Sequence, residues 1–254
     1  MRQHLLLFLF LFFTSCNKSS DSLPESPESK SVREEAVDKK VTESRSNALG
    51  LFLMELATKE DFQDAKNLFQ DSFLQDTQQV RKVDSAIRLK TKRGWNPYVV
   101  FTDTLLDTDD DAIREYQYLG QYKELDKYLV SGSFWEHFEC YAVDKETGQI
   151  TTFWNCPTIS PDKKMLANLS MAYGLEGVPN GIQVWKVEHE YQNQQGPIAI
   201  SKFIEIDQQV WAPDDFVWKS PSSIILQVFS IETFWEKQGD LTEDDFQYLR
   251  LKFN

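Results

Sequence analysis

The sequence predicts a mainly β fold, in which an antiparallel β domain follows an N-terminal amphipathic helix, so that the protein is α+β overall. The first observation is that short runs rich in Val, Ile, Phe, Tyr and Trp recur at intervals of about ten residues through most of the chain. The second is that Gly, Pro, Asn and Asp separate these runs, which is typical of the turns of antiparallel sheets. The third is a stretch near residue 60 in which apolar residues recur with the period of a helix.

The chain opens with a segment typical of exported proteins. Arg2 precedes the apolar run Leu5–Phe13, which is too short to cross a bilayer, because a membrane-spanning helix needs about 20 apolar residues. A basic start, a short apolar run and small residues before a cleavage site indicate a signal peptide over residues 1–15. The small pair directly before Cys16 ("TSC") resembles the lipobox of bacterial lipoproteins. That resemblance implies that Cys16 is acylated; the alternative is an ordinary signal peptide next to an incidental cysteine.

Residues 16–45 are predicted to form a lipidated, disordered tether. They are rich in Ser, Glu, Lys and Pro and hold almost no large apolar residue, so they cannot bury enough surface to offset the entropy of ordering. The same resemblance implies that Asn17 after the cysteine directs the protein to the outer membrane of a bacterial envelope. Both the periplasmic side and the outer side of that membrane remain open as the side on which the protein lies. The expected partners are therefore the membrane, through the lipid anchor, and an envelope protein. The net charge of −13 argues against nucleic acid.

Residues 46–84 are predicted to form a helical segment. An apolar patch, "NALGLFLMELA", comes first, and the sequence "TKED" that begins at Thr58 then resembles a capping box. The apolar residues that follow recur at spacings of three and four: Phe62, Ala65, Phe69 and Phe73. This pattern predicts an amphipathic helix over about residues 59–75.

Residues 85–254 are predicted to form the antiparallel β domain. Two runs at its start, "AIRLKT" and "YVVFTDT", are separated by turn residues and predict a hairpin. The later strand-like runs are "REYQYLGQY", "YLVSGSFWEHFECYAV", "QITTFW", "KMLANLS", "GIQVWKVE", "ISKFIEI", "FVWKS", "SIILQVFS" and "FQYLRLKF". No convincing helical pattern lies among them.

One stretch resembles the blade repeats of β-propellers. "CPTISPDKKMLANLS" is similar to their Ser-Pro-Asp-Gly-Lys signature, matched at Ser160, Pro161, Asp162, Lys164 and Ala167, with Lys163 where the family places its turn glycine. "VWAPDDFVWKSPSSIILQVF" is a looser second copy. The resemblance implies blade-like meanders but no function. Residues 116–254 number only 139, whereas a closed ring of four blades needs about 160, so we expect an open or sandwich-like arrangement.

The two remaining cysteines, Cys140 and Cys156, flank a predicted hairpin turn. If Asp144 pairs with Gln149 across that turn, the two thiols lie about 10 Å apart along the strands and on opposite faces. A disulfide needs Cα atoms within about 7 Å. The bridge therefore requires a bulge or a bend near Asn155, and without one both cysteines stay unbridged.

We expect no catalytic residue, cofactor or metal ion, because none of the familiar motifs for them occurs in the chain. The register above sets Cys156 opposite His137, which is explained more simply as a packing pair than as a nucleophile and its base. In "EHFEC", alternation along a strand puts His137 and Glu139 on one face and Glu136 and Cys140 on the other, so these four do not converge on a metal. "DTDDD", residues 107–111, departs from the EF-hand pattern, and a looser calcium site is the alternative to a solvated acidic loop.

Two kinds of residue keep a glycan open as a ligand. Paired carboxylates, Asp214–Asp215 and Asp244–Asp245, fit turns and helix caps, but such groups also act on sugars. Five tryptophans lie on predicted strands, where core packing is the simplest reading and an exposed shelf for a glycan is the alternative: Trp135, Trp154, Trp185, Trp211 and Trp218.

These observations predict a lipid-anchored bacterial envelope protein that acts as a non-enzymatic binding or assembly module. The alternative is a glycan-binding or glycan-hydrolysing envelope protein. Aromatic side chains exposed on a concave surface would favour the glycan, whereas their burial would favour a protein partner.

Overall fold

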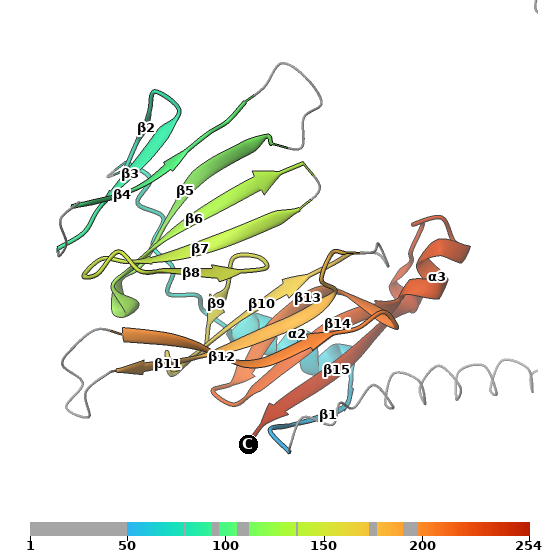
Figure 1. The fold of residues 1–254 in the computed structure, drawn as a ribbon. Coiled ribbons are helices and arrows are strands. Elements are labelled where there is room, and N and C mark those ends of the chain that lie inside the picture. The colour runs from blue at the N-terminus through green and yellow to red at the C-terminus, as the bar shows by residue number, and fades with distance from the viewer. Residues whose placement is uncertain are drawn as a thin grey trace, which may run out of the picture. The chain divides into compact units, whose positions relative to one another are not determined.

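The computed structural model describes residues 50–78, 80–92, 97–105, 112–135, 137–172, 177–189 and 198–254. In this part of the chain the protein is mainly β and its sheets are antiparallel, which confirms the predicted class (Figure 1). The predicted signal peptide, Cys16, the tether, the "DTDDD" stretch and Glu136 lie outside the described residues.

The described strands form four antiparallel sheets, numbered here in the order in which their meanders follow along the chain. The first contains β2 (Lys82–Val83), β3 (Ala86–Lys90) and β4 (Tyr98–Thr102). The second contains β5 (Arg114–Tyr122), β6 (Lys127–Phe134), β7 (Phe138–Asp144) and β8 (Ile150–Phe153). The third contains β9 (Thr158–Ile159), β10 (Met165–Ser170), β11 (Gly181–His189) and β12 (Ile198–Asp207). The fourth has the order β1 (Phe52–Ala57), β15 (Phe246–Phe253), β14 (Ser223–Ser230) and β13 (Trp211–Ser220).

The predicted hairpins are present. β3 pairs with β4, and β7 pairs with β8 so that Cys140 lies opposite Phe153, as the predicted register requires. The amide of Asp144 donates to the carbonyl of Gln149 at 2.9 Å. The turn between β7 and β8 is closed by the Asp144 carboxylate, which accepts from the Thr147 amide at 2.6 Å. "YLVSGSFWEHFECYAV", by contrast, is two strands, β6 and β7.

The described part of residues 46–84 is only partly helical, because it contains the strands β1 and β2 as well as a helix; for these residues the predicted helical segment is corrected. Within the apolar patch, β1 pairs along its whole length with β15, with Phe52 opposite Phe253 and Ala57 opposite Tyr248. Residues 52–57 of the patch are therefore the edge strand of the fourth sheet. Its partner is the last strand of the chain, and a contact between such distant segments leaves no local pattern to read.

The predicted helix begins where expected but is shorter. α2 (Lys59–Leu68) starts after Thr58, whose side chain accepts from the Asp61 amide, and it buries Phe62 and Ala65 against the fourth sheet. It ends at Leu68 because the chain then turns extended, and Leu74 exchanges two backbone hydrogen bonds of 3.0 Å with Gln121 of β5. A second helix, α3 (Ile231–Glu236), was not predicted, since six residues are too few to show a period.

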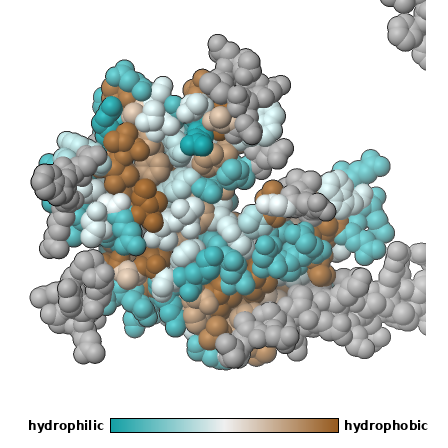
Figure 2. All heavy atoms as spheres, in the orientation of Figure 1, coloured by the Kyte–Doolittle hydropathy of each residue, from teal (hydrophilic) through white to brown (hydrophobic). Residues whose placement is uncertain are grey.

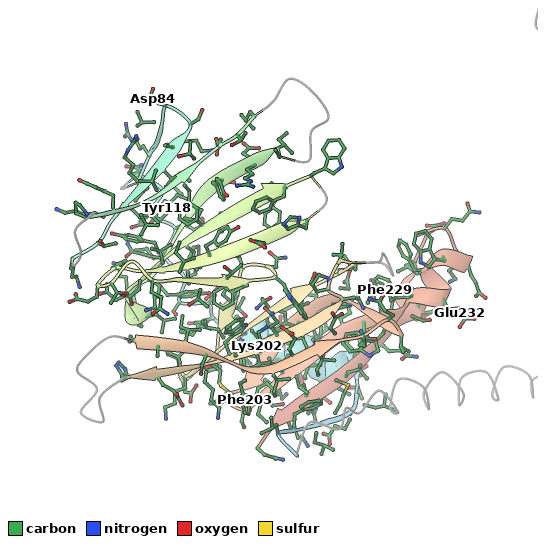
Figure 3. The ribbon with its side chains drawn as sticks, viewed as in Figure 1. Asp84, Tyr118, Lys202, Phe203, Phe229 and Glu232 are labelled. Carbon is green, nitrogen blue, oxygen red and sulfur yellow. A yellow bond between two sulfur atoms is a disulfide. The ribbon has the colours of Figure 1, made fainter. Side chains whose placement is uncertain are left out.

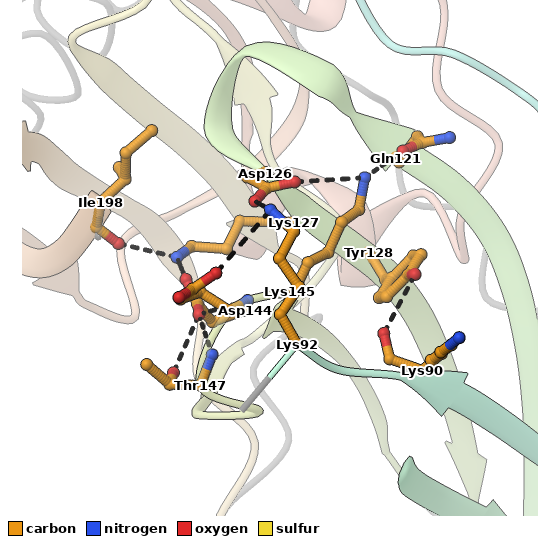
Figure 4. A network of polar contacts seen from close by, with 11 residues as sticks. Lys90, Lys92, Gln121, Asp126, Lys127, Tyr128, Asp144, Lys145, Thr147 and Ile198 are labelled. Carbon is orange, nitrogen blue, oxygen red and sulfur yellow. Dashed lines mark hydrogen bonds and ion pairs between the residues drawn. The ribbon is translucent and has the colours of Figure 1, made fainter. Parts of the chain in front are cut away.

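A buried ion pair joins the second sheet to the third (Figure 4). Lys127 and Asp144 are partners in the β6–β7 register, and their side chains are only 5% and 7% exposed. The Lys127 ammonium also donates to the carbonyl of Ile198, the first residue of β12, at 2.7 Å. Burial raises the pKa of Asp144, but hydrogen bonds from Lys127 and Thr147 outweigh it, so this pKa lies below its ordinary value.

We predict that Lys127→Met lowers the free energy of unfolding at pH 7 by about 3 kcal/mol or more, because it leaves the Asp144 carboxylate buried without its counter-charge. In the wild type a lowered pKa means that the stabilisation by Asp144 is present above its ordinary pKa and is lost as the pH falls through the folded value. In the variant, protonation of Asp144 removes an uncompensated buried charge and so stabilises the fold. The difference in the free energy of unfolding between the wild type and the variant therefore narrows towards pH 3. Urea denaturation of both proteins between pH 3 and pH 7 measures this difference.

The control for this prediction is Lys92→Met. Lys92 makes an ion pair of 2.8 Å with Asp126 in the same network, but the two side chains are 62% and 43% exposed. Such a pair contributes about 1 kcal/mol or less. Equal losses for the two lysine variants would contradict the role assigned to the buried pair.

Candidate functional site

A cleft of about 930 Å³ opens between the second and third sheets, a volume within the range of small-molecule sites. One wall comes from the ends of β6, β7 and β8. The other comes from the end of β10, from residues 177–179 and from β11 and β12. Pieces of chain that are far apart in sequence therefore meet here, on strands that the two sheets hold in place.

Rings line the wall formed by the second sheet. Phe134 and His137 stack face to face, with centroids 4.4 Å apart and an angle of 2° between their planes. Phe138, the first residue of β7, is 46% exposed, and Trp154, just after β8, is partly buried. All four residues line the cleft, so the wall presents aromatic surface to solvent.

Polar side chains on the third sheet face this wall. Gln183 of β11 is buried; its oxygen accepts from the Trp154 amide at 3.3 Å and its nitrogen donates to Glu205 at 2.6 Å. Lys202 forms an ion pair with Glu205. Burial raises the pKa of Glu205, but the bonds from Lys202 and Gln183 outweigh it, and the pKa lies below its ordinary value. The charge of Lys202 is therefore compensated within the protein.

A bulge in β12 brings Lys202 and Glu205 close enough to form their ion pair. Trp185 of β11 pairs with Lys202 and Val184 pairs with Ile204, which leaves Phe203 without a partner in the register. One extra residue reverses the alternation, so Lys202 and Glu205 come to the same face although they are three residues apart. Lys202 lines the cleft, whereas Phe203 packs towards Phe253 of the fourth sheet. Figure 3 labels Lys202 and Phe203.

Glu139 is the carboxylate on the cleft wall among the described lining residues. It accepts a hydrogen bond from the hydroxyl of Tyr141. Burial and then this bond raise the pKa of Tyr141, so the tyrosine stays a neutral donor. The imidazole of His137 lies 3.9 Å from Glu139, too far for a direct hydrogen bond.

Cys140 and Cys156 form a disulfide, with their Cα atoms 4.9 Å apart. The predicted register is confirmed, with Cys140 opposite Phe153, but it does not continue to Cys156, so the thiols do not lie far apart on opposite faces and the bridged alternative holds. β8 ends at Phe153, and a bend at Trp154 and Asn155 then turns the chain back towards β7. This is the bend near Asn155 that the bridge requires.

The disulfide changes the reading of His137 as well. Cys156 is bonded to Cys140 and does not face His137, which instead stacks on Phe134 with half of its side chain exposed. The bend that the bridge holds carries Trp154 and Asn155, and both line the cleft. The disulfide therefore supports one wall of the site.

The other sequence candidates lie away from the cleft lining. Asp215 binds Lys66 of α2 at 2.6 Å, and burial followed by the charge of Asp215 raises the pKa of Asp214. Asp245 accepts from Lys237 and then from the Thr242 amide at the turn, and these bonds lower the pKa of Asp245 to about 2. Within the described ranges, no three His, Cys, Asp or Glu side chains lie close enough together to hold a metal ion.

The five tryptophans divide into two groups. Trp185, Trp211 and Trp218 are buried in the core, whereas Trp135 is 48% exposed and Trp154 lines the cleft. Other exposed apolar residues lie outside the cleft, such as Leu53 and Leu56 on the edge strand β1. Figure 2 shows hydrophobic side chains at the surface around the fourth sheet and over one end of the first and second sheets.

The sequence did not identify Phe134, Phe138, Gln183 or Lys202 as site residues. The one signal that points to two of them is the aromatic cluster in "SFWEHF", where the strand breaks into a hairpin. No family model matches the chain, and no curated protein or solved structure is significantly similar to it. No helix among the described residues has the length and apolarity needed to span a membrane.

We predict that replacing both cysteines (C140A/C156A) lowers the free energy of unfolding by about 3 kcal/mol, the chain-entropy value for a loop of about 15 residues. Amide exchange at residues 154–157 should also become faster, because the bend loses its covalent anchor. Reducing the wild type with a thiol should reproduce both effects. Full alkylation of the two thiols in the native protein without reductant, detected by mass spectrometry, would contradict the bridge.

Proposed function

We propose that the protein is a lipid-anchored component of a bacterial envelope whose β domain binds a ligand in the cleft without transforming it. The cleft with its exposed rings is the observation that carries the binding role. Exposed aromatic side chains grouped in a concave wall are uncommon on a protein surface without a partner. The lipobox-like "TSC" and the polar stretch after it support the anchor and the tether.

Binding is favoured over catalysis by how the polar groups are arranged. Ser133, His137 and Glu139 all line the cleft and are the residue types of a hydrolytic triad. In a triad the base is hydrogen-bonded to the nucleophile and oriented by the acid. No hydrogen bond joins these three described side chains to one another, and His137 is stacked on Phe134. Glycosidases need a pair of carboxylates, and Glu139 is a single one on the described lining.

We also infer that the second, third and fourth sheets are blade-like units in an open arrangement. Each has four antiparallel strands. The turn that resembles the propeller signature has its own bonds, since Ser160 and the amide of Lys164 both donate to Asp162. Lys163 has a φ of 64°, the left-handed conformation for which the propeller family uses glycine.

We expect Cys16→Ser to release the protein from the membrane. The wild type should incorporate a fatty-acid analogue and sediment with membranes, because acyl chains make attachment stable. The variant should lose the label and appear in the soluble fraction. Equal labelling of both proteins, with equal sedimentation, would rule out Cys16 as the anchor.

We expect envelope material to slow amide exchange in the cleft of the full-length protein. Separate polysaccharide, peptidoglycan, lipid and protein fractions would be added, and hydrogen exchange followed by mass spectrometry. One fraction should protect residues 133–135, 137–139 and 152–155 and leave β4 unchanged. No protection by any fraction would refute the binding role, and consumption of the protecting ligand over time would refute the absence of catalysis.

A further inference from the structure

We infer that the ligand of the cleft is a neutral saccharide, which rests on the proposed function of the cleft as a binding site. A sugar ring has two kinds of surface. Its C–H faces pack on aromatic rings, and its hydroxyl groups donate and accept hydrogen bonds. The described walls of the cleft offer partners for both.

The rings are placed for stacking. The flat pair of Phe134 and His137 has an open side, because half of the His137 side chain is exposed. Phe138 follows directly at the start of β7 and is exposed to a similar degree. These side chains stand on the β6–β7 hairpin, so the second sheet holds them and little conformational entropy is lost when a ligand covers them.

The polar groups suit hydroxyl partners. Gln183 and Asn155 carry amides, Ser133 and Ser170 carry hydroxyls, and all four line the cleft. Groups of this kind both donate and accept, as a hydroxyl does. Gln183 is buried and held by its two hydrogen bonds, so it supports the lining. The exposed Ser133 and Asn155 and the partly exposed Ser170 are the groups that a ligand hydroxyl can reach.

The charges of the cleft argue for a neutral ligand. Lys202, a cation on the lining, is already paired with Glu205, so a phosphate, sulfate or uronate would find no unpaired Lys or Arg among the described lining residues. Glu139 adds a negative charge that repels such groups. The net charge of −13 acts in the same direction.

The test measures binding of the full-length lipidated protein to immobilised oligosaccharides. Neutral probes are glucans, mannans, xylans and chito-oligosaccharides; anionic probes are polygalacturonate and sulfated glycans. We expect neutral probes to bind, with an affinity that changes little between about 50 and 500 mM salt, because no charge of the ligand is screened. Preferential binding of the anionic probes, or no binding to any saccharide, overturns the inference.

A matched pair of variants locates the binding. Phe138→Ala should weaken the best neutral probe by about tenfold or more, as expected for the loss of an aromatic contact. Tyr98→Ala is the control, because Tyr98 lies on β4 outside the cleft lining and is 43% exposed, close to the 46% of Phe138. It should bind like the wild type. Unchanged binding by Phe138→Ala, or equal losses for the two variants, overturns the assignment to this cleft.

The hydrogen-exchange experiment separates this inference from the proposed function. If an envelope fraction protects the cleft while no saccharide binds, the cleft holds a ligand of another class and only the saccharide inference fails. If neither occurs, both fail.

Discussion

Two opposite charges buried at one end of the β6–β7 hairpin constrain the arrangement of the second and third sheets. Removing a lysine and an aspartate from water costs several kcal/mol for each ion, and this cost is offset only where further hydrogen bonds complete the site. Here Lys127 donates a further hydrogen bond to the Ile198 carbonyl, and Asp144 accepts a further one from the Thr147 amide. Because Ile198 begins β12, the pair fixes the third sheet against the second at this end of their strands.

The cleft lies at the other end of the same hairpin. β6 runs from Lys127 to Phe134, about 23 Å at 3.3 Å per residue, and Phe134 lines the cleft. Between the two ends, an apolar cluster holds the sheets together, with Phe153 and Trp185 in edge contact at 4.9 Å. The disulfide of Cys140 belongs to this cluster. The sheets are thus closed by an ion pair at one end, packed in the middle and open at the far end, which explains where the cleft forms.

Local patterns in the sequence predicted the elements well where their cause is local. Asp144 and Gly148 specify a tight turn, so the register of β7 and β8 follows from them. Contacts between distant segments were missed, as for β1, whose partner is the last strand of the chain. The helix was predicted too long for a related reason. Phe73 continues the helical spacing, but it packs at 5.2 Å on Tyr122 of β5 instead, and that contact outweighs a weak local preference.

The cleft was harder to foresee because several of its lining residues are placed by breaks in the regular alternation of the strands. Phe134, His137 and Phe138 of "SFWEHF" reach the cleft because the strand ends at Phe134 and restarts at Phe138. Trp154 reaches it through the bend that the disulfide holds. Lys202 and Glu205 share a face only because Phe203 is an extra residue in β12. A period-two reading assigns such residues to the wrong face, so the same irregularities that hide the site from the sequence are the ones that build it.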